Sequence, residues 1–579
     1  MQLLQHFKEL TIRPKNAQEL KGLILQLAIQ GKLTANWREQ NKNIEPASEL
    51  LNRIQKEKAQ LIKDKKIRKN KSLPNIKKDE FPFKIPNKWI WCRLQDYLDV
   101  RDGTHDSPKY IDDGIPLVTS KNLYTKKLDI SNVKYISEED HIEISKRSNV
   151  ERNDILFAMI GSIGNPVIVD IEPNFSIKNV ALIKYYLKDL CLPNFVLFFL
   201  EYATKEFKDN SDGAVQSFVS LTKLRAKEFP LPPLEEQKEI VKVVETLFKK
   251  VEQLEQLTVA RIGLKEDFVT SALNQLTTNN ATQEWTFLQE HFKSFFNETT
   301  NIKKLRETVL QLAVQGKLTA DWRSRHPELV SGSHHASQLL KRIQKEKAQL
   351  IKDKKLKKEK ALSKITEDEI PYELPEGWVW CRLNELTELI TKGSSPKWQG
   401  IQYVDEGEGI LFVTSENVGN YKLIWKKKKF VESKFNEIST RSILKRNDLL
   451  MNIVGGSIGR TAIYNIDELA NINQAVTIIR LFPKVSYDYF LHFFNSPICI
   501  SYMYDKQVDN ARPNLSMGNI SKFMIPLPPL EEQKAIVEKV NDLMGLCDAL
   551  EQEVQQSQEH SEMMMQSVLR EVFEPNNLN

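Results

Sequence analysis

Apolar residues recur at heptad spacing in two stretches of the chain, and each stretch follows the motif PLPPLEEQK. They fall at Ile240, Val244, Leu247, Val251 and Leu254 after the first motif, and at Ile536, Val540, Leu543, Cys547 and Leu550 after the second. This spacing is typical of the a and d positions of a coiled coil, and the prolines suit a helix start. It predicts two long helices that pair with each other or with equivalent partners. We expect an antiparallel pair.

The first of these helices should run from Leu234 to about Leu273. At 1.5 Å per residue its length would be roughly 60 Å, which is enough to hold two domains apart. Arg261 and Gly263 interrupt the apolar pattern, so the seam should shift or end there.

Shorter patterns predict the remaining elements. Residues 17–32 and 302–317 have an amphipathic helical period, and a basic helix should follow from Ser48, whose hydroxyl is the expected N-cap. The blocks 81–229 and 371–525 contain short runs of β-branched and aromatic residues, broken by Gly, Asn, Asp and Pro. Within these blocks, helices are expected from Leu192 and from Val485. Each block is predicted to be a small, twisted, barrel-like β domain with some helices, whose loops can present side chains.

The chain is a tandem duplication. Residues 26–37 match residues 311–322 at ten of twelve positions, residues 53–66 recur unchanged at 342–355, and WCRL occurs at Trp91 and at Trp380. The two blocks between these motifs share only fragments, namely VTS, RND and GSIG. A doubling that merely enlarges a core is one explanation, but it does not explain why the loop-forming residues differ most. Each half therefore combines a near-constant helical part with a variable part.

These patterns divide the chain into five segments. They are an N-terminal helical region (1–80), a first variable domain (81–231), a central region with a long helix (232–370), a second variable domain (371–527) and a C-terminal helix (528–579). We predict an α+β fold with an internal pseudo-two-fold repeat. Two mixed α/β, β-rich and barrel-like domains are expected to be joined by two long antiparallel coiled-coil helices.

Composition narrows the class of protein. Of the 579 residues, 41% are hydrophobic and 28% charged, and no apolar run of about 18 residues is present to span a bilayer. The first residues lack the pattern of a secretory signal, and the five cysteines are scattered without a C-x-x-C pair. We therefore expect a cytoplasmic protein without a membrane partner, a disulfide framework or a zinc cluster.

Charge is informative only locally. The 83 Lys and Arg residues against 77 Asp and Glu give a net charge of +6, which is too small to diagnose a nucleic-acid binder. Eleven basic residues against two acidic ones fall between Arg53 and Lys78. That segment is either a solvated, flexible arm or one that follows phosphates, and its exact recurrence at Arg342 does not decide between them.

The patterns of catalytic sites are missing from the sequence. The Gly-Lys pairs at Gly31 and Gly316 lack the first glycine and the Ser/Thr of a phosphate-binding loop. The Pro-Pro pairs at Pro232 and Pro528 lie between leucines, whereas a base-methylating enzyme needs a polar residue before them and an aromatic after them. GSIG is interpreted as a tight turn, and the adjacent His334 and His335 have no partner at metal-ligand spacing. We expect a non-catalytic chain with no metal and no cofactor of its own.

Taken together, the duplicated PLPPLEEQ motif with its heptad helix, the duplicated QGKLT-x-x-W and the two diverged blocks resemble the specificity subunit of type I restriction-modification systems. The resemblance covers nearly the whole chain. It implies that the variable blocks are target recognition domains, and that the near-constant helices fix their separation and bind methyltransferase subunits. It also implies partners: double-stranded DNA, two adenine methyltransferase subunits that use S-adenosylmethionine, and motor-nuclease subunits that use ATP and magnesium.

Two unlike recognition domains on a duplicated frame should bind a bipartite, asymmetric site, with half-sites about one helical turn (~34 Å) apart. Specificity would come from loop side chains at major-groove edges, and lysines would add affinity without discrimination. Candidate loop residues in the first domain are Thr104, His105, Asp106, Ser107, Ser120, Lys121, Asn122, Ser162, Asn165, Lys178, Asn179, Gln216 and Ser217. Those in the second are Lys392, Ser394, Ser395, Ser415, Glu416, Asn417, Ser457, Arg460, Asn473, Gln474, Arg512 and Asn514. Each could instead be an ordinary turn or cap residue.

Four tryptophans recur in the near-constant part, at Trp37, Trp89, Trp322 and Trp378. They are expected to be core residues or contacts to a partner subunit rather than platforms for base stacking. Three other functions stay open: a specificity subunit of a related methyltransferase-nuclease system, a self-contained nuclease or methyltransferase with unfamiliar motifs, and a coiled-coil scaffold whose variable blocks bind proteins.

Overall fold

The computed structural model describes residues 14–74, 76–124, 126–211, 217–278, 282–358, 362–505 and 514–573. The chain forms two compact units, Met1–Ile262 with Val568–Asn579 (unit 1) and Gly263–Ser567 (unit 2). Their boundary falls inside helix α9 (Leu234–Thr278), between Ile262 and Gly263. The predicted segment 232–370 therefore contributes to both units. No helix in the described ranges is long and apolar enough to cross a membrane.

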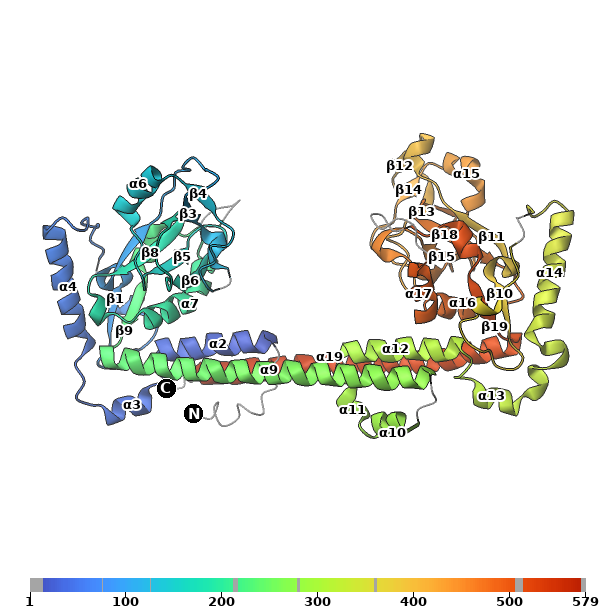
Figure 1. The fold of residues 1–579 in the computed structure, drawn as a ribbon, viewed down its shortest axis with the longest axis horizontal. Coiled ribbons are helices and arrows are strands. Elements are labelled where there is room, and N and C mark those ends of the chain that lie inside the picture. Colours follow the sequence, from blue (N-terminus) through green and yellow to red (C-terminus); the bar gives the residue numbers. More distant parts are fainter. Residues whose placement is uncertain are drawn as a thin grey trace. The chain divides into compact units, whose positions relative to one another are not determined.

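Each unit contains a pair of open sheets (Figure 1). In unit 1 the strand orders are β2 (Leu98–Asp102), β8 (Val180–Tyr185), β5 (Ile155–Ala158), β6 (Gly164–Ile168), and β4 (Lys134–Ile136), β3 (Ile115–Val118), β7 (Ser176–Ile177). In unit 2 they are β11 (Thr387–Lys392), β18 (Val476–Leu481), β15 (Leu449–Asn452), β16 (Thr461–Ile463), and β12 (Tyr403–Val404), β14 (Phe430–Val431), β13 (Ile410–Val413), β17 (Ala470–Ile472). The β-rich prediction is confirmed, but in the described part of the chain no sheet closes into a barrel. The strands are two to six residues long, and separate sheets share only isolated bridges such as Thr104 with Lys178.

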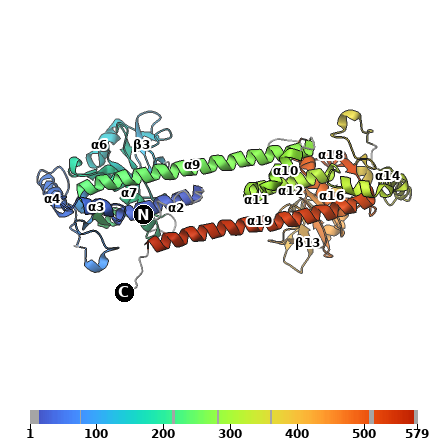
Figure 2. The same cartoon turned by 90° about the horizontal axis from the view of Figure 1, so that it is seen from below.

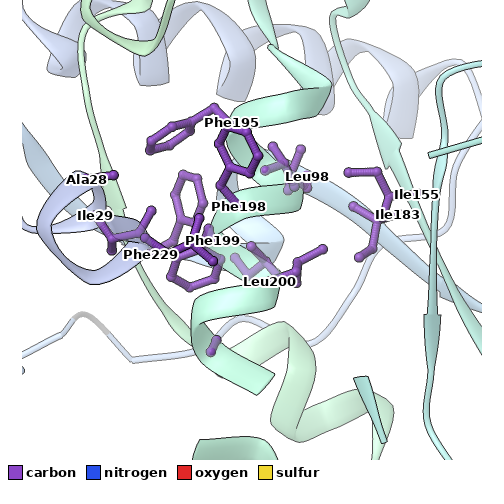
Figure 3. Packing of buried hydrophobic residues seen from close by; sticks show 14 of the residues in the cluster. Ala28, Ile29, Leu98, Ile155, Ile183, Phe195, Phe198, Phe199, Leu200 and Phe229 are labelled. Carbon is purple, nitrogen blue, oxygen red and sulfur yellow. The ribbon is translucent and has the colours of Figure 1, made fainter. Parts of the chain in front are cut away.

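Helix α7 (Pro193–Asp209) fills the core of unit 1. Figure 3 shows Phe195, Phe199 and Leu200 of α7 between Ala28 and Ile29 of helix α2 (Pro14–Ile29) and the sheet residues Leu98, Ile155 and Ile183. In unit 2 the matching layer is α16 (Tyr487–Phe494) with α17 (Pro497–Asp505), and both helices that were predicted inside the variable blocks are present. Aromatic residues dominate this layer because large rings fill the space between a helix and a twisted sheet.

A two-stranded ladder joins the two ends of each variable block. Strand β1 (Ile90–Arg93), which carries WCRL, pairs antiparallel with β9 (Glu228–Leu231), and Trp91 lies opposite Pro230. In unit 2, β10 (Val379–Arg382) pairs with β19 (Met524–Leu527) in the same register. The prolines are tolerated because each ladder has only two strands and leaves an edge. Two motifs that lie far apart in the sequence thus meet where the block begins and ends.

A buried carboxylate at the start of each long helix connects the other recurring motifs. Glu236, the second glutamate of PLPPLEEQ, is 0% exposed and accepts hydrogen bonds from Thr34 Oγ1 (2.7 Å) and Trp89 Nε1 (2.8 Å). It also pairs with the Arg38 guanidinium. We call Glu236 with these three donors the carboxylate hub of unit 1. It holds α2, the short helix α3 (Ala35–Gln40) and the strand after Trp89 against the first turn of α9.

Unit 2 has the same hub. Glu532 is 0% exposed, accepts from Thr319 Oγ1 (2.7 Å) and Trp378 Nε1 (2.8 Å), and pairs with Arg323. Trp89 and Trp378 are therefore core residues, as expected. Trp37 and Trp322 are only half-buried and lie beside the hubs on α3 and on α13 (Ala320–Arg325).

The basic helices are docked rather than free. Helix α4 (Ala47–Lys63) buries Leu50 and Ile54, and Lys58 Nζ donates to the Gln95 carbonyl at 2.7 Å. Helix α14 (Ala336–Lys352) repeats this contact with Lys347 and the Asn384 carbonyl (2.5 Å), and Lys347 also donates to the Thr387 carbonyl (3.0 Å). The flexible-arm alternative is therefore wrong for residues 53–63, which hold four of the eleven basic residues. The predicted Ser48 cap is wrong as well, because the helix starts one residue earlier with Pro46 as N-cap.

The heptad residues of each long helix pack mainly against the hydrophobic core of one unit. Ile240, Val244, Leu247, Val251 and Leu254 pack into the core of unit 1, and Ile536, Val540 and Leu543 of α19 (Leu530–Phe573) pack into that of unit 2. At these positions each long helix therefore packs against equivalent elements of its own unit, which is the second of the two predicted alternatives. After Gly263 the partners of α9 change, as the break in the pattern predicted. Val269 and Leu273 then share a cluster with Cys547 and Leu550 of α19.

Within unit 2, a third helix contacts both long helices (Figure 2). Lys304 of α12 (Thr299–Val314) donates to Thr270 Oγ1 of α9 at 2.7 Å. Arg306, two residues on, pairs with Asp548 (2.6 Å) and Glu551 (2.8 Å) of α19. Unit 1 repeats this ion pair at the matching positions, with Lys21 of α2 and Glu252 of α9 at 2.8 Å. The second half of the seam is therefore a three-helix contact rather than a simple two-helix one.

The carboxylate hub predicts an asymmetry between two neighbouring glutamates. Glu236→Ala should destabilise unit 1 by about 3–5 kcal/mol, because it leaves the Arg38 charge and the Trp89 N–H without their acceptor. Glu235→Ala should change stability by less than about 0.5 kcal/mol, since Glu235 is exposed and only pairs with Lys238. Hydrogen exchange, followed separately in peptides of each unit, measures both effects. Equal protection in the two variants would contradict the role of the hub.

Candidate nucleic-acid interface

In unit 1 the structure brings five of the predicted recognition residues together. Thr104 forms a bridge with Lys178, and Lys178 Nζ donates to Ser107 Oγ. The His105 ring, which is 55% exposed, lies 3.2 Å from Asn179 Oδ1 through Nδ1. Asn179 has a φ of 56°, a left-handed conformation that asparagine tolerates better than most residues. Two loops far apart in the sequence therefore form one polar surface, which we call recognition patch 1.

An acidic residue that was not predicted from the sequence is hydrogen-bonded to recognition patch 1. Asp102, at the end of β2, is 6% exposed; it pairs with Arg147, and its Oδ2 accepts from His105 Nε2 at 3.0 Å. Asp102 thereby fixes the orientation of the exposed imidazole. No local motif marks Asp102 and Arg147, since their pairing depends on the docking of α6 (Glu138–Ser148) on the sheet.

A second group forms around the turn between β5 and β6. Ser162 bonds with Tyr124, an aromatic residue that is 60% exposed, and the Gly161 N–H donates to the Ser217 carbonyl at 3.0 Å. Asn165 is half-buried with a φ of 47°, and Lys121 is exposed. Gln216 lies outside the described residues. Tyr124 was missed by the sequence reasoning, and its only signal is an aromatic residue directly after the Ser120 to Leu123 turn.

The matching patch of unit 2 contains Lys392, Ser394, Asn473 and Gln474. The backbones approach so closely here that a Cβ on Gly393 would lie 2.0 Å from the Ile472 carbonyl oxygen. The Asn473 N–H donates to the Val413 carbonyl at 3.0 Å, whereas Lys392 and Gln474 are exposed. We call these four residues recognition patch 2. Asn514, bridged to Val454, and the exposed Arg460 with Ser457 lie on the neighbouring turn, and Arg512 lies outside the described residues.

Two of the predicted recognition residues have a structural role instead. Asn122 is 6% exposed; its Oδ1 accepts from the Thr119 N–H (2.9 Å) and its Nδ2 donates to the Asp129 carbonyl (2.9 Å). Asn417, 2% exposed, makes the same bonds with Thr414 and with the Ile424 carbonyl. Both amide groups are already hydrogen-bonded inside the turn, so the prediction that these residues contact bases is wrong. A buried asparagine that caps a turn cannot be told from an exposed one by its sequence.

The motifs that the two variable blocks share are also structural. In RND, Asn153 and Asn447 take left-handed conformations, with φ of 71° and 72°. Asp154 is 1% exposed and pairs with Lys184 at 2.7 Å, and burial raises the pKa of its carboxyl while Lys184 opposes that rise. Asp448 pairs instead with Nε and Nη2 of Arg480, each at 2.7 Å. The aspartate that the blocks share is thus buried and ion-paired, whereas the arginine and asparagine before it are exposed.

Comparison with known proteins identifies this arrangement. A model of the type I restriction modification DNA specificity domain matches residues 86–260 and again residues 375–559, which together make up more than half of the chain. The chain belongs to this family. Each match covers most of one variable block and the first part of the long helix that follows it.

Two relatives in the specificity family extend over nearly the whole chain. The specificity subunit of the type I restriction enzyme EcoAI of Escherichia coli is 29% identical over 558 residues, covering 92% of this chain and 90% of the relative. That of EcoEI, also from Escherichia coli, is 28% identical over 566 residues, covering 94% and 91%. A solved structure concerned with complex assembly and conformational transition of the type I R-M system contains a chain that is 18% identical to this one. The TM-score is 0.48, and the match covers 85% of this chain and 99% of that chain.

The different burial of two amide side chains in unit 2 gives a prediction. Asn417→Ala should lower the free energy of unfolding by about 1–3 kcal/mol, because it leaves buried turn donors and acceptors unpaired. Gln474→Ala should change it by less than about 0.5 kcal/mol, since that side chain is exposed. Thermal unfolding of both variants measures the difference. A larger loss in Gln474→Ala would mean that the assignment of the two roles is reversed.

Proposed function

We propose that this protein is the DNA specificity subunit of a type I restriction-modification complex and that it recognises a bipartite, asymmetric duplex site. The observation that carries the proposal is the division within the repeat. Both units use the same buried hub, ladder and turn motifs, whereas the exposed side chains of their recognition patches differ. A protein whose two halves have one frame and two unlike polar surfaces suits a target made of two unlike half-sites on one duplex.

Each recognition patch has suitable chemistry for base edges. Patch 1 offers an imidazole, an amide and a lysine from two loops held by backbone bridges, and patch 2 offers a lysine and two amides. Amides suit adenine, and lysine suits guanine, at the edges exposed in the major groove. Because these groups stand on strand ends rather than on long loops, they lose little conformational freedom on binding.

The covalent chemistry is assigned to partner subunits. The related chains of Escherichia coli are named as specificity subunits of restriction enzymes, which supports the inference that this chain acts within such a complex. We infer two adenine methyltransferase subunits that use S-adenosylmethionine, and motor-nuclease subunits that use ATP and magnesium. This chain is inferred to be non-catalytic and to need none of these cofactors by itself.

Methylation mapping tests the proposal most directly. The chain is expressed with its methyltransferase partner in cells that lack other adenine methylation, and modified adenines are located by sequencing. A bipartite consensus with a fixed spacer is expected. Methylation by the purified chain alone would instead establish a self-contained enzyme, and partner binding without any DNA consensus would favour a protein-interaction scaffold.

Single substitutions in the two patches should separate the half-sites. His105→Ala is expected to relax base preference in one half-site only, and Gln474→Ala in the other only, each by roughly 5-fold to 150-fold at the base concerned. Both side chains are exposed, so folding should be unaffected. The same methylation maps provide the measurement, and each variant is the control for the other. Relaxation of the same half-site by both variants would contradict the assignment of one patch to each half-site.

A further inference from the structure

The two recognition domains share a short exposed sequence in a region where they otherwise diverge. Residues 107–110 read Ser-Pro-Lys-Tyr and residues 395–398 read Ser-Pro-Lys-Trp. Both segments come shortly after the strand end that supplies the recognition patch, since Ser107 lies five positions after Asp102, the last residue of β2, and Ser395 lies three positions after Lys392, the last residue of β11. In RND the aspartate is buried and ion-paired, so that fragment has a structural role, whereas this segment has its lysine and its aromatic ring exposed.

In unit 2 the shared sequence forms a stiff turn. Pro396 is buried, the Ile401 N–H donates to the Pro396 carbonyl at 3.1 Å, and Gly400 closes the turn with a φ of 70°. Ser439 Oγ donates to Gln399 Oε1 at 3.1 Å, and this bond ties the turn to the C-terminal end of helix α15 (Lys434–Ile438). Between these fixed points Trp398 is 82% exposed. A rigid turn that holds a large ring away from the protein suits contact with another molecule.

In unit 1 the matching residues 107–110 form no turn, but they are tied to recognition patch 1. Lys178 of that patch donates to Ser107 Oγ, and Lys134 Nζ lies 4.1 Å from the centre of the Tyr110 ring. Tyr110 is 41% exposed, so part of its ring is already covered.

The charges near the two segments in the sequence differ. Asp106, Asp112 and Asp113 flank residues 107–110 of unit 1, whereas residues 392–404 of unit 2 contain two lysines and no carboxylate. The surroundings of Trp398 therefore favour a polyanion more strongly than those of Tyr110.

We propose that these two segments contact the sugar-phosphate backbone of the duplex, one segment in each half-site. Lys109 and Lys397 would pair with phosphates, and Tyr110 and Trp398 would pack on neighbouring deoxyriboses. The reason is the contrast with the patches: two domains that recognise different bases retain a common element only for what the half-sites share, and that is the backbone. The inference rests on the proposed function and adds to it residues that set position without selecting sequence.

The test measures equilibrium binding by the complex with the methyltransferase partner to two duplexes, one carrying the mapped site and one with that site scrambled, over a series of salt concentrations. Trp398→Ala should weaken binding to both duplexes about tenfold and leave their ratio unchanged. Lys397→Gln should reduce the slope of log affinity against log salt by about 0.9, as expected for one lost phosphate contact. Tyr110→Ala should act in the same direction but less strongly, and Trp398→Phe should retain most of the affinity.

Two exposed residues of unit 2 outside the near-constant helices serve as matched controls. Leu469→Ala, beside the carboxylates Asp467 and Glu468, and Lys484→Gln, whose ammonium pairs with Glu346, should leave DNA binding and its salt slope unchanged; the two positions are 59% and 44% exposed. Relaxed base preference in Trp398→Ala would overturn the proposal, because the ring would then be selecting sequence. Unchanged DNA affinity with weaker partner binding would also overturn it. If the unaltered complex discriminates the two duplexes, the proposed function stands whatever the variants do; if it does not, both proposals fail.

Discussion

The frame of each unit depends on one buried negative charge. Glu236 and Glu532 sit in the first turn of a long helix, where the N-terminal end of the helix dipole favours a carboxylate. Each accepts hydrogen bonds from a threonine hydroxyl and an indole N–H and pairs with a guanidinium. These donors lie up to about two hundred residues away in the sequence. A carboxylate removed from water is costly unless all its acceptor positions are used, so the hub forms only when those segments are in place together. It therefore couples the helical frame to the start of the recognition domain.

The hub also explains which residues recur between the two halves. The members of the hub, or residues next to them, come from QGKLT-x-x-W, from the tryptophan before WCRL and from PLPPLEEQ. Gln237, which follows Glu236, donates through Nε2 to the Pro232 carbonyl at 3.0 Å. Periodicity and repetition were enough to predict the long helices, the tandem organisation and the break near Gly263. They could not reveal that a glutamate in a surface-like motif is fully buried, because its donors come from elsewhere in the chain.

The candidate site was predictable in outline but not residue by residue. Thr104, His105, Lys178 and Asn179, predicted from loops after short strands, do come together, and their contact with DNA stays a prediction. Asn122 and Asn417 were misassigned because the burial of a turn depends on the sheet beneath it. Tyr124 and Trp398 were overlooked because an isolated aromatic residue in a loop resembles a core residue until its exposure is known. The pairing of the seam with α2 and α12 likewise depends on tertiary packing, which heptad spacing leaves undetermined.

The β1 and β9 ladder has a consequence for how such a protein can change. Because the first and last strands of a variable block are hydrogen-bonded neighbours, everything between them enters and leaves the frame at a single point. The two blocks of this chain differ in length and in most of their residues, yet their ladders have the same register. A replacement block therefore needs to supply the same closing strands and a helix that packs on α2 and α9 as α7 does. A new variable block can therefore bring a new specificity while the near-constant helices keep their sequence.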